Sequence, residues 1–249
     1  MCFELDSQPP VAPIAGAAVT HATLTLNSAD GTPFMAFAAT PDEPATTGVV
    51  VLPDVRGLYS FYEELALRFA ERGMHAVAID YFGRTAASAE RGEDFAFREH
   101  VDQTTPEGIR DDVGAAVAHL REQGAQAIFT VGFCFGGRNA WLAAADGHGI
   151  AGAVGFYGMP GERGGRPGAI QRAGEISAPI LALMAGADQA IGADQVAALD
   201  AALSEAGVEH EVVTYEGAPH SFFDRKQDEY AEASEDAWRR TLAFIEQHA

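Results

Sequence analysis

The chain has 249 residues, 47% of them apolar, with 2 Cys, 16 Lys or Arg and 36 Asp or Glu, which gives a net charge of −20. The apolar content excludes a disordered chain, the two cysteines exclude a disulfide scaffold, and the excess of acid argues against nucleic-acid and anionic-membrane partners. The longest apolar runs are shorter than the ~20 residues that a membrane span needs. Glu4 and Asp6 are acidic where a secretory leader would carry positive charge, so we expect a soluble, cytoplasmic protein.

The first predicted elements are an N-terminal arm over residues 1–20 and a β-hairpin. Apolar and polar residues alternate in Ala22–Leu26 and in Phe34–Ala38. The connection between them contains Asp30 and Gly31, a dipeptide favoured in hairpin turns. We therefore expect these two segments to pair as antiparallel strands.

After the hairpin, short β-branched runs alternate with amphipathic helical patterns. Strands are predicted at Val49–Leu52, Ala76–Ile79, Ala127–Val131, Val154–Tyr157, Ile180–Met184 and Glu211–Tyr215, and helices around residues 61–69, 109–120, 137–145, 196–203 and 230–245. This alternation predicts one α/β domain over residues 1–249, with a mostly parallel sheet of roughly eight strands and helices on both faces. Ligands of such sheets bind at the carboxyl ends of the strands. Residues 85–106, which are charged and show little periodicity, form a candidate lid.

A glycine-rich turn directly follows the predicted strand Ala127–Val131. It reads Gly132-Phe133-Cys134-Phe135-Gly136-Gly137 and opens a helix, which is the form of a nucleophile elbow with cysteine in place of serine. The glycines allow the helix to pack close to the strand. The helix N-terminus favours the thiolate over the thiol. A buried structural cysteine is the alternative interpretation, whereas Cys2 has no such context and is interpreted as an inert thiol.

A cysteine nucleophile needs a general base and an acid that orients it. Of the eight histidines, His220 is the one in a loop just beyond a late strand, within Gly217-Ala218-Pro219-His220-Ser221-Phe222. Asp188 follows the strand Ile180–Met184, and Asp80 is the weaker alternative acid. The chain order Cys134, Asp188, His220 is the order of nucleophile, acid and base in elbow-type hydrolases.

These motifs resemble the dienelactone hydrolase family, a cysteine branch of the α/β-hydrolase superfamily, from about Phe34 to the end of the chain. The resemblance implies the α/β-hydrolase fold, with Cys134 as nucleophile, His220 as base and Asp188 as its acid. It aligns Asp54 with a family glutamate that holds the cysteine, in a loop that also supplies an oxyanion-hole N–H. It also implies that Arg84 binds a substrate carboxylate.

Two positions depart from the family pattern. The family glutamate is shortened to Asp54, and the second substrate-binding arginine falls on Asp224, with Arg225 one place later. Arg56, beside the oxyanion loop, is a candidate to compensate for the displaced arginine. The oxyanion hole is expected from the N–H groups of Val55 and Phe135. Tyr157 and Phe222 are candidate lining residues of the substrate pocket.

The sequence thus predicts a hydrolase that cleaves ester or lactone bonds of a small molecule through a thioester on Cys134. No metal or organic cofactor is expected, and the chain is expected to be a monomer or small homo-oligomer. A carboxylesterase, thioesterase or phosphotriesterase of neutral substrates remains an alternative, because the triad does not select among them. A thiol redox sensor and a binding protein that has lost the reaction are the alternatives from other classes.

Overall fold

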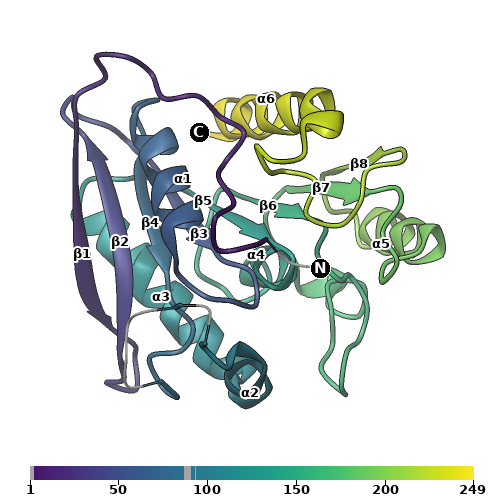
Figure 1. The fold of residues 1–249 in the computed structure, drawn as a ribbon. Coiled ribbons are helices and arrows are strands. Elements are labelled where there is room, and N and C mark those ends of the chain that lie inside the picture. The colour runs from purple at the N-terminus through teal and green to yellow at the C-terminus, as the bar shows by residue number, and fades with distance from the viewer. Residues whose placement is uncertain (1–2, 87–90, 93) are drawn as a thin grey trace.

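The computed structural model describes residues 3–86, 91–92 and 94–249, and within them eight strands form one sheet (Figure 1). The strands are β1 (Val19–Asn27), β2 (Pro33–Pro41), β3 (Thr47–Leu52), β4 (His75–Ile79), β5 (Ala127–Phe133), β6 (Gly152–Phe156), β7 (Ile180–Ala185) and β8 (His210–Tyr215). They lie in the order β1-β2-β4-β3-β5-β6-β7-β8. The predicted number of strands is confirmed.

The predicted hairpin forms one edge of this sheet. β1 and β2 pair antiparallel along their whole length, and β2 then pairs antiparallel with β4. Gly31 takes a positive φ of 84° in the turn, and the Asp30 carboxylate accepts the Thr32 N–H at 2.9 Å. The remaining pairs, from β4 to β8, are parallel, so the sheet is mostly parallel as predicted.

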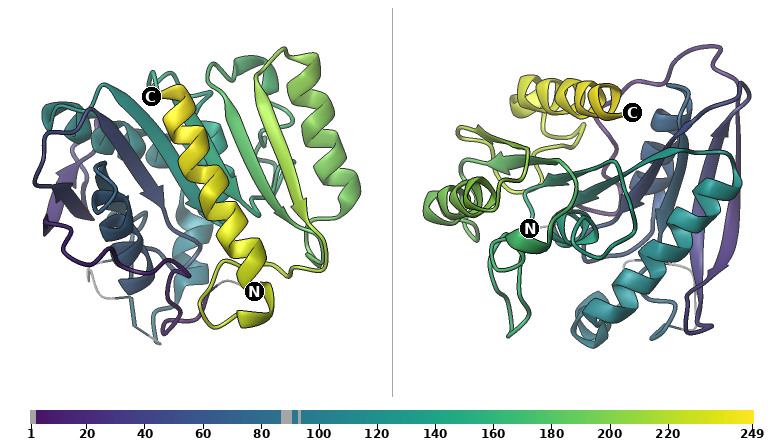
Figure 2. Two further views of the ribbon diagram at one scale, coloured as in Figure 1. Left: turned by 90° about the horizontal axis from the view of Figure 1, so that it is seen from above. Right: turned by 180° about the vertical axis from the view of Figure 1, so that it is seen from behind.

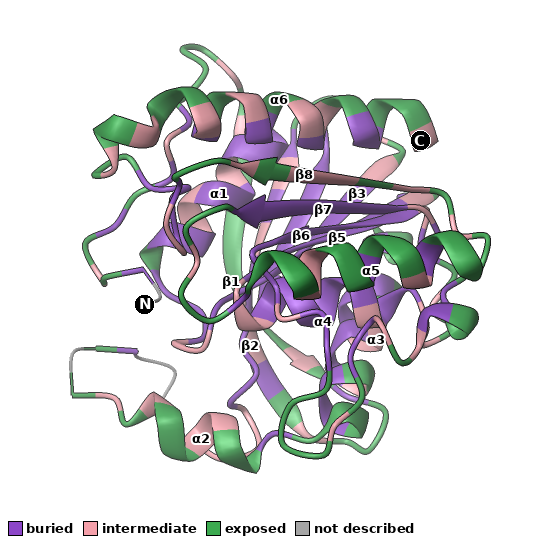
Figure 3. Ribbon diagram, turned by 90° about the vertical axis from the view of Figure 1, so that its right-hand side faces the viewer, coloured by how far each residue is buried: buried purple, intermediate pink, exposed green. Residues whose placement is uncertain are grey.

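Helices cover both faces of the sheet. They are α1 (Ser60–Ala70), α2 (Phe97–Gln103), α3 (Pro106–Glu122), α4 (Phe135–Ala143), α5 (Ala193–Glu205) and α6 (Ala231–His248). Along β3, Val49 and Val51 join the core under α1 and α6, whereas Val50 and Leu52 join the core under α3, α4 and α5. Figures 2 and 3 show α6 crossing one face of the sheet, with α4 and α5 on the other. In the part of the chain that the structure describes, no helix is long and apolar enough to cross a membrane.

The structure differs from the predicted elements mainly at their ends. Helix α4 begins at Phe135, two residues earlier than predicted, because Cys134 itself caps it. Strand β6 ends at Phe156, and Tyr157 leaves the sheet with a φ of 38°. Helix α2 was not predicted and lies within the candidate lid, of which residues 87–90 and 93 are outside the described residues.

Candidate active site

Cys134 occupies a strained turn between β5 and α4. Its φ of 55° and ψ of −111° lie outside the regions that L-residues usually adopt. Its N–H donates to Phe156 O at 2.9 Å, and its carbonyl accepts Arg138 N–H at 3.2 Å, so the turn is fixed on both sides. The residue is partly exposed. A strained, over-determined backbone of this kind is typical of functional positions.

The glycines around Cys134 are required by close backbone contacts. A Cβ on Gly132 would overlap the carbonyl of Gly136, and a Cβ on Gly136 would overlap the carbonyl of Leu52 on β3. A Cβ on Gly137 would lie 2.5 Å from Phe156 O. The helix therefore approaches β3, β5 and β6 at backbone distance, as the sequence motif predicts.

His220 and Asp188 are in direct contact at the same end of the sheet. His220 Nδ1 lies 2.6 Å from Asp188 Oδ2. Asp188 Oδ1 also accepts the N–H of Ala190 at 2.8 Å and of Ile191 at 3.3 Å. Because Nδ1 is engaged by the carboxylate, Nε2 is the nitrogen left to exchange a proton with another group.

The electrostatics of Asp188 suit an acid that stays ionised. Burial alone would raise the pKa of its carboxyl, but the hydrogen bonds from His220 and from the Ala190 N–H outweigh this, and the pKa is lowered. Its side chain is only 2% exposed, against 14% for His220. The other candidate acid, Asp80, is instead paired with the buried Arg91.

Tyr157 lies between His220 and strand β6, which accepts the Cys134 N–H through Phe156 O. Its ring centroid lies 4.9 Å from that of His220, and it directly follows Phe156, whose carbonyl holds the Cys134 N–H. Phe222 lies edge-on to Tyr157 at 5.6 Å, and both side chains are fully buried in the apolar core. Of the two predicted pocket residues, Tyr157 thus contacts His220 and Phe222 packs against Tyr157.

The loop after β3 lies beside the elbow. Asp54 is fully buried, its N–H donates to the Tyr62 hydroxyl at 2.9 Å, and its Oδ1 accepts the Arg56 N–H at 2.8 Å. The Tyr81 hydroxyl donates to Pro53 O at 3.0 Å and fixes the start of the loop. Val55 follows in this loop, and Phe135 is the first residue of α4, the two positions expected to supply oxyanion N–H groups.

Asp54 is a perturbed acid. Burial raises its pKa to about 7, against the opposing influence of the Arg56 N–H and charge, the Phe3 N–H and the Tyr62 hydroxyl. Strongly perturbed pKa values of this kind cluster at functional sites. The participation of Phe3, from the N-terminal arm, is not apparent from the sequence pattern.

The predicted substrate-binding arginines have different surroundings. Arg84 pairs with Asp30 in the hairpin turn and with Asp112 on α3 at 3.0 Å. Arg225 donates to the Gln8 side chain at 2.6 Å and to Pro9 O at 3.2 Å on the N-terminal arm. Arg56 stacks over Phe97 of α2 at 5.5 Å, and its buried Nε has no hydrogen-bond partner among the described residues. Of the three, the structure keeps only Arg56 next to the loop that follows β3.

Two features of the site are missing from the sequence interpretation. One is the buried ion pair of Asp80 and Arg91, which attaches the candidate lid to the end of β4. The other is Phe3, which is 2% exposed and packs against Phe61 and Phe133. An isolated phenylalanine before a proline-containing stretch carries no periodic signal, so nothing in the pattern places it here.

The described residues contain no group of three or more His, Cys, Asp or Glu side chains arranged to hold a metal ion. Cys2, the second cysteine of the chain, lies outside the described residues.

An eight-stranded, mostly parallel sheet with a strained cysteine elbow after β5 and an acid–histidine pair after β7 and β8 defines the class: an α/β-hydrolase. The profile of the dienelactone hydrolase family matches residues 34–249. The chain is 29% identical to a carboxymethylenebutenolidase of Rhodococcus opacus, over all of this chain and 97% of that one. The chain belongs to the dienelactone hydrolase family, and it is a hydrolase of ester or lactone bonds.

Solved structures show the same architecture. A provisionally named dienelactone hydrolase from Klebsiella pneumoniae superposes with a TM-score of 0.81 at 28% identity, over 92% of this chain and 99% of that one. A dienelactone hydrolase-like promiscuous phosphotriesterase from metagenomic libraries superposes with a TM-score of 0.79 at 22% identity, over 94% and 99% of the two chains. The second likeness concerns the fold alone.

Proposed function

We propose that the chain hydrolyses a small ester or lactone through a thioester on Cys134. The observation that carries the proposal is the 2.6 Å contact of His220 Nδ1 with Asp188 Oδ2. This contact lies at the carboxyl ends of the parallel strands, where the turn at Cys134 also lies. An imidazole held in this way accepts a proton through Nε2 while the carboxylate stabilises the resulting positive charge. The site can thus generate a thiolate and later activate water.

In the first half-reaction, the Cys134 thiol gives its proton to His220 Nε2 and the sulfur attacks the carbonyl carbon. The N–H groups of Phe135 and Val55 stabilise the oxyanion, and the removal of one such donor raises the barrier by about 2.7–4 kcal/mol in a well-studied acyl-transfer enzyme. His220 then protonates the leaving oxygen, and a thioester remains. In the second half-reaction, His220 takes a proton from water and the resulting hydroxide attacks the thioester carbonyl. The C–S bond breaks, the acid leaves, and His220 returns the proton to the Cys134 sulfur.

The surroundings of the arginines bear on the class of substrate. The Arg84 guanidinium pairs with Asp112 and the Arg225 guanidinium with Gln8, whereas the Arg56 guanidinium stacks on the Phe97 ring. The buried Nε atoms of both Arg56 and Arg84 have no hydrogen-bond partner among the described residues. We infer that a substrate carboxylate, where there is one, contacts Arg56. Neutral aryl esters, thioesters or phosphotriesters are the second candidate class, supported by the engagement of the other two arginines.

Intact-mass spectrometry of the acyl-enzyme tests the proposal. Wild-type protein mixed with p-nitrophenyl acetate and quenched in acid should gain one acetyl group, located on Cys134 by peptide mapping. Cys134→Ala should stay folded, gain no acetyl group and turn over no ester. Equal turnover by wild type and Cys134→Ala would refute the nucleophile. A mass change with peroxide but no turnover of any ester would favour the thiol sensor.

A further inference from the structure

Residues 3–11, in the first half of the N-terminal arm, pack against side chains that neighbour the site. Phe3 stacks on Phe61 of α1 with ring centroids 4.1 Å apart, and it lies 6.1 Å from Phe133 and 6.3 Å from Tyr157. Cys134 packs against the same apolar cluster. The Tyr157 ring therefore lies between the Phe3 ring and His220, and Phe3 belongs to the apolar cluster that Cys134 packs against.

The backbone of the arm is fixed at both sides of the site. The Phe3 N–H is directed at the Asp54 carboxyl, in the loop after β3. Farther along, Gln8 O accepts the Arg225 N–H at 2.9 Å, and Gln8 N–H donates to Asp224 Oδ1 at 3.3 Å. The two partners of Gln8, Arg225 and Asp224, belong to the segment that follows His220. The arm therefore connects the loop after β3, which contains Asp54, with the loop that contains His220.

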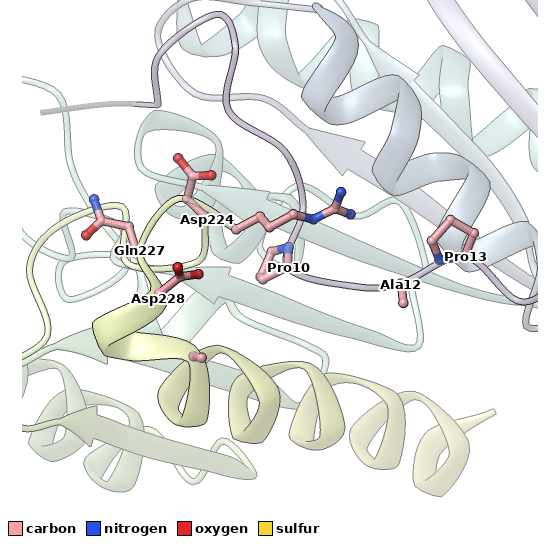
Figure 4. Close-up of a pocket in the computed structure, with 8 residues that line it drawn as sticks. Pro10, Ala12, Pro13, Asp224, Gln227 and Asp228 are labelled. Carbon is pink, nitrogen blue, oxygen red and sulfur yellow. The ribbon is translucent and has the colours of Figure 1, made fainter.

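Beyond this bridge the arm is a separate layer over the fold. A cavity of about 340 Å³ lies between Pro10 and Pro13 of the chain start and the segment from Asp224 to Ala231 (Figure 4). The purple start of the chain in Figure 1 runs across the front of the fold to the end labelled N. Phe3 is thus held in place by aromatic packing at its own position and by the Gln8 contacts, and the cavity lies beyond Gln8.

We propose that Phe3 determines the size of substrate that the site accepts, because its ring fills the buried space between Phe61, Phe133 and Tyr157 next to His220. The proposal rests on the proposed function, because it assigns this space to the substrate of the same reaction. The family profile matches residues 34–249 only, so the ring is supplied by a segment outside the matched region. Removing the ring would leave a space bordered by Phe61, Phe133 and Tyr157, which longer apolar groups would enter.

Kinetics with p-nitrophenyl acetate, butanoate and hexanoate test the proposal, together with a second series of acetyl esters of growing alcohols. Phe3→Ala should raise the ratio of kcat/KM for the longest to the shortest ester in one series by about tenfold, since a few methylenes in an apolar pocket are worth that much or more. Phe3→Trp should lower the same ratio. Ile14→Ala is the matched control, because Ile14 is a large apolar residue that is 43% exposed beyond the arm. An unchanged ratio in both series, in folded Phe3→Ala, would overturn the proposal.

Alkylation of Cys134 gives a measurement that does not depend on turnover. Phe3→Ala should react about tenfold faster than wild type with the bulky N-phenylmaleimide, as expected for relief of a steric limit, and at an unchanged rate with iodoacetamide. If no ester is turned over but this selectivity appears, the proposed function fails and the role of Phe3 stands. If esters are turned over but both alkylators react equally in the two proteins, the role of Phe3 fails alone. Thermal melting of each variant shows that it is folded.

Discussion

Asp188 Oδ2 lies 2.6 Å from His220 Nδ1, and the same carboxylate accepts two backbone N–H groups through Oδ1. The backbone of its own turn thereby orients the carboxylate, and the carboxylate in turn orients the imidazole. This arrangement sets the histidine tautomer with Nε2 directed away from Asp188. The Asp188–His220 pair is thus a rigid unit supplied by the loops after β7 and β8.

Asp188→Asn should lower kcat/KM by up to about 10⁴-fold, the cost of a wrong histidine tautomer in a related triad. The amide keeps the size of the carboxylate, so the melting temperature should change little. Asp194→Asn, an exposed acid in the first turn of α5, is the control and should leave kcat/KM unchanged. Equal activity of wild type and Asp188→Asn would assign the orienting role to another group.

The lowered pKa of Asp188 has a defined effect on the pH dependence of stability. A depressed carboxyl pKa contributes stability above the unfolded value of about 3.9, and this contribution is lost as the pH falls through the folded value. The stabilising contribution of Asp188, measured as the difference in free energy of unfolding between wild type and Asp188→Asn, should therefore be fully present at pH 5. It should shrink below about pH 4. Urea unfolding at a series of pH values measures it, and a difference that grows on acidification would contradict the prediction.

Gly136→Ala should unfold or strongly destabilise the protein, because the new Cβ would overlap the carbonyl of Leu52. Backbone cannot move aside as a flexible side chain does, so a cost of about 4 kcal/mol or more is expected. Gly174→Ala is the matched control, since nothing lies within 4 Å of its added Cβ. A Gly136→Ala protein with the melting temperature of wild type would show that α4 is packed less tightly than described.

The elbow and the Asp188–His220 pair could be predicted because their signals are local. Gly132, Gly136 and Gly137 encode the close approach of α4 to three strands within six residues. The strand-to-helix alternation predicts parallel strands, and the loops after β5, β7 and β8 then all lie at the carboxyl ends of these strands. Neither inference needs information on which distant side chains touch.

The partners of the arginines could not be predicted, because they depend on contacts between segments far apart in the sequence. Arg84 finds Asp30 across 54 residues, and Arg225 finds Gln8 across 217. Alignment with a family motif gives such a side chain a position, but its direction follows from the charges that the whole fold places around it. The packing of Phe3 against Phe61 of α1 could not be predicted for the same reason, because it is also a contact between distant segments.

Arg56→Gln should raise KM for an anionic lactone such as dienelactone by about tenfold, with little change for a neutral aryl ester, because one charge-assisted hydrogen bond is lost. Arg84→Gln should change the two KM values equally or not at all, since its guanidinium is held by Asp30 and Asp112. Steady-state kinetics with both substrates decides between the two arginines. A selective effect of Arg84→Gln on the anionic substrate would return the carboxylate-binding role to Arg84.

Asp54→Asn should make the protein relatively more stable as the pH rises. The folded pKa of Asp54 is about 7 and the unfolded value about 3.9, so the folded protein retains a proton that the unfolded chain releases between these values. Stability from this group is therefore lost with increasing pH, by about 3 kcal/mol between pH 5 and pH 8 at 1.36 kcal/mol per pH unit below the folded pKa. Asparagine does not titrate, so the Asp54→Asn protein does not lose this part of its stability as the pH rises.

The measurement is the difference in free energy of unfolding between Asp54→Asn and wild type, from urea unfolding at pH 5, 6, 7 and 8. Two other buried acids, Asp80 and Asp112, also have raised pKa values, but both proteins contain them and their contributions cancel in the difference. The difference should shift in favour of Asp54→Asn up to about pH 7 and then level off. A constant difference would mean that Asp54 is already ionised at pH 5, stabilised by the N–H groups of Arg56 and Phe3 and the Tyr62 hydroxyl more than burial opposes it.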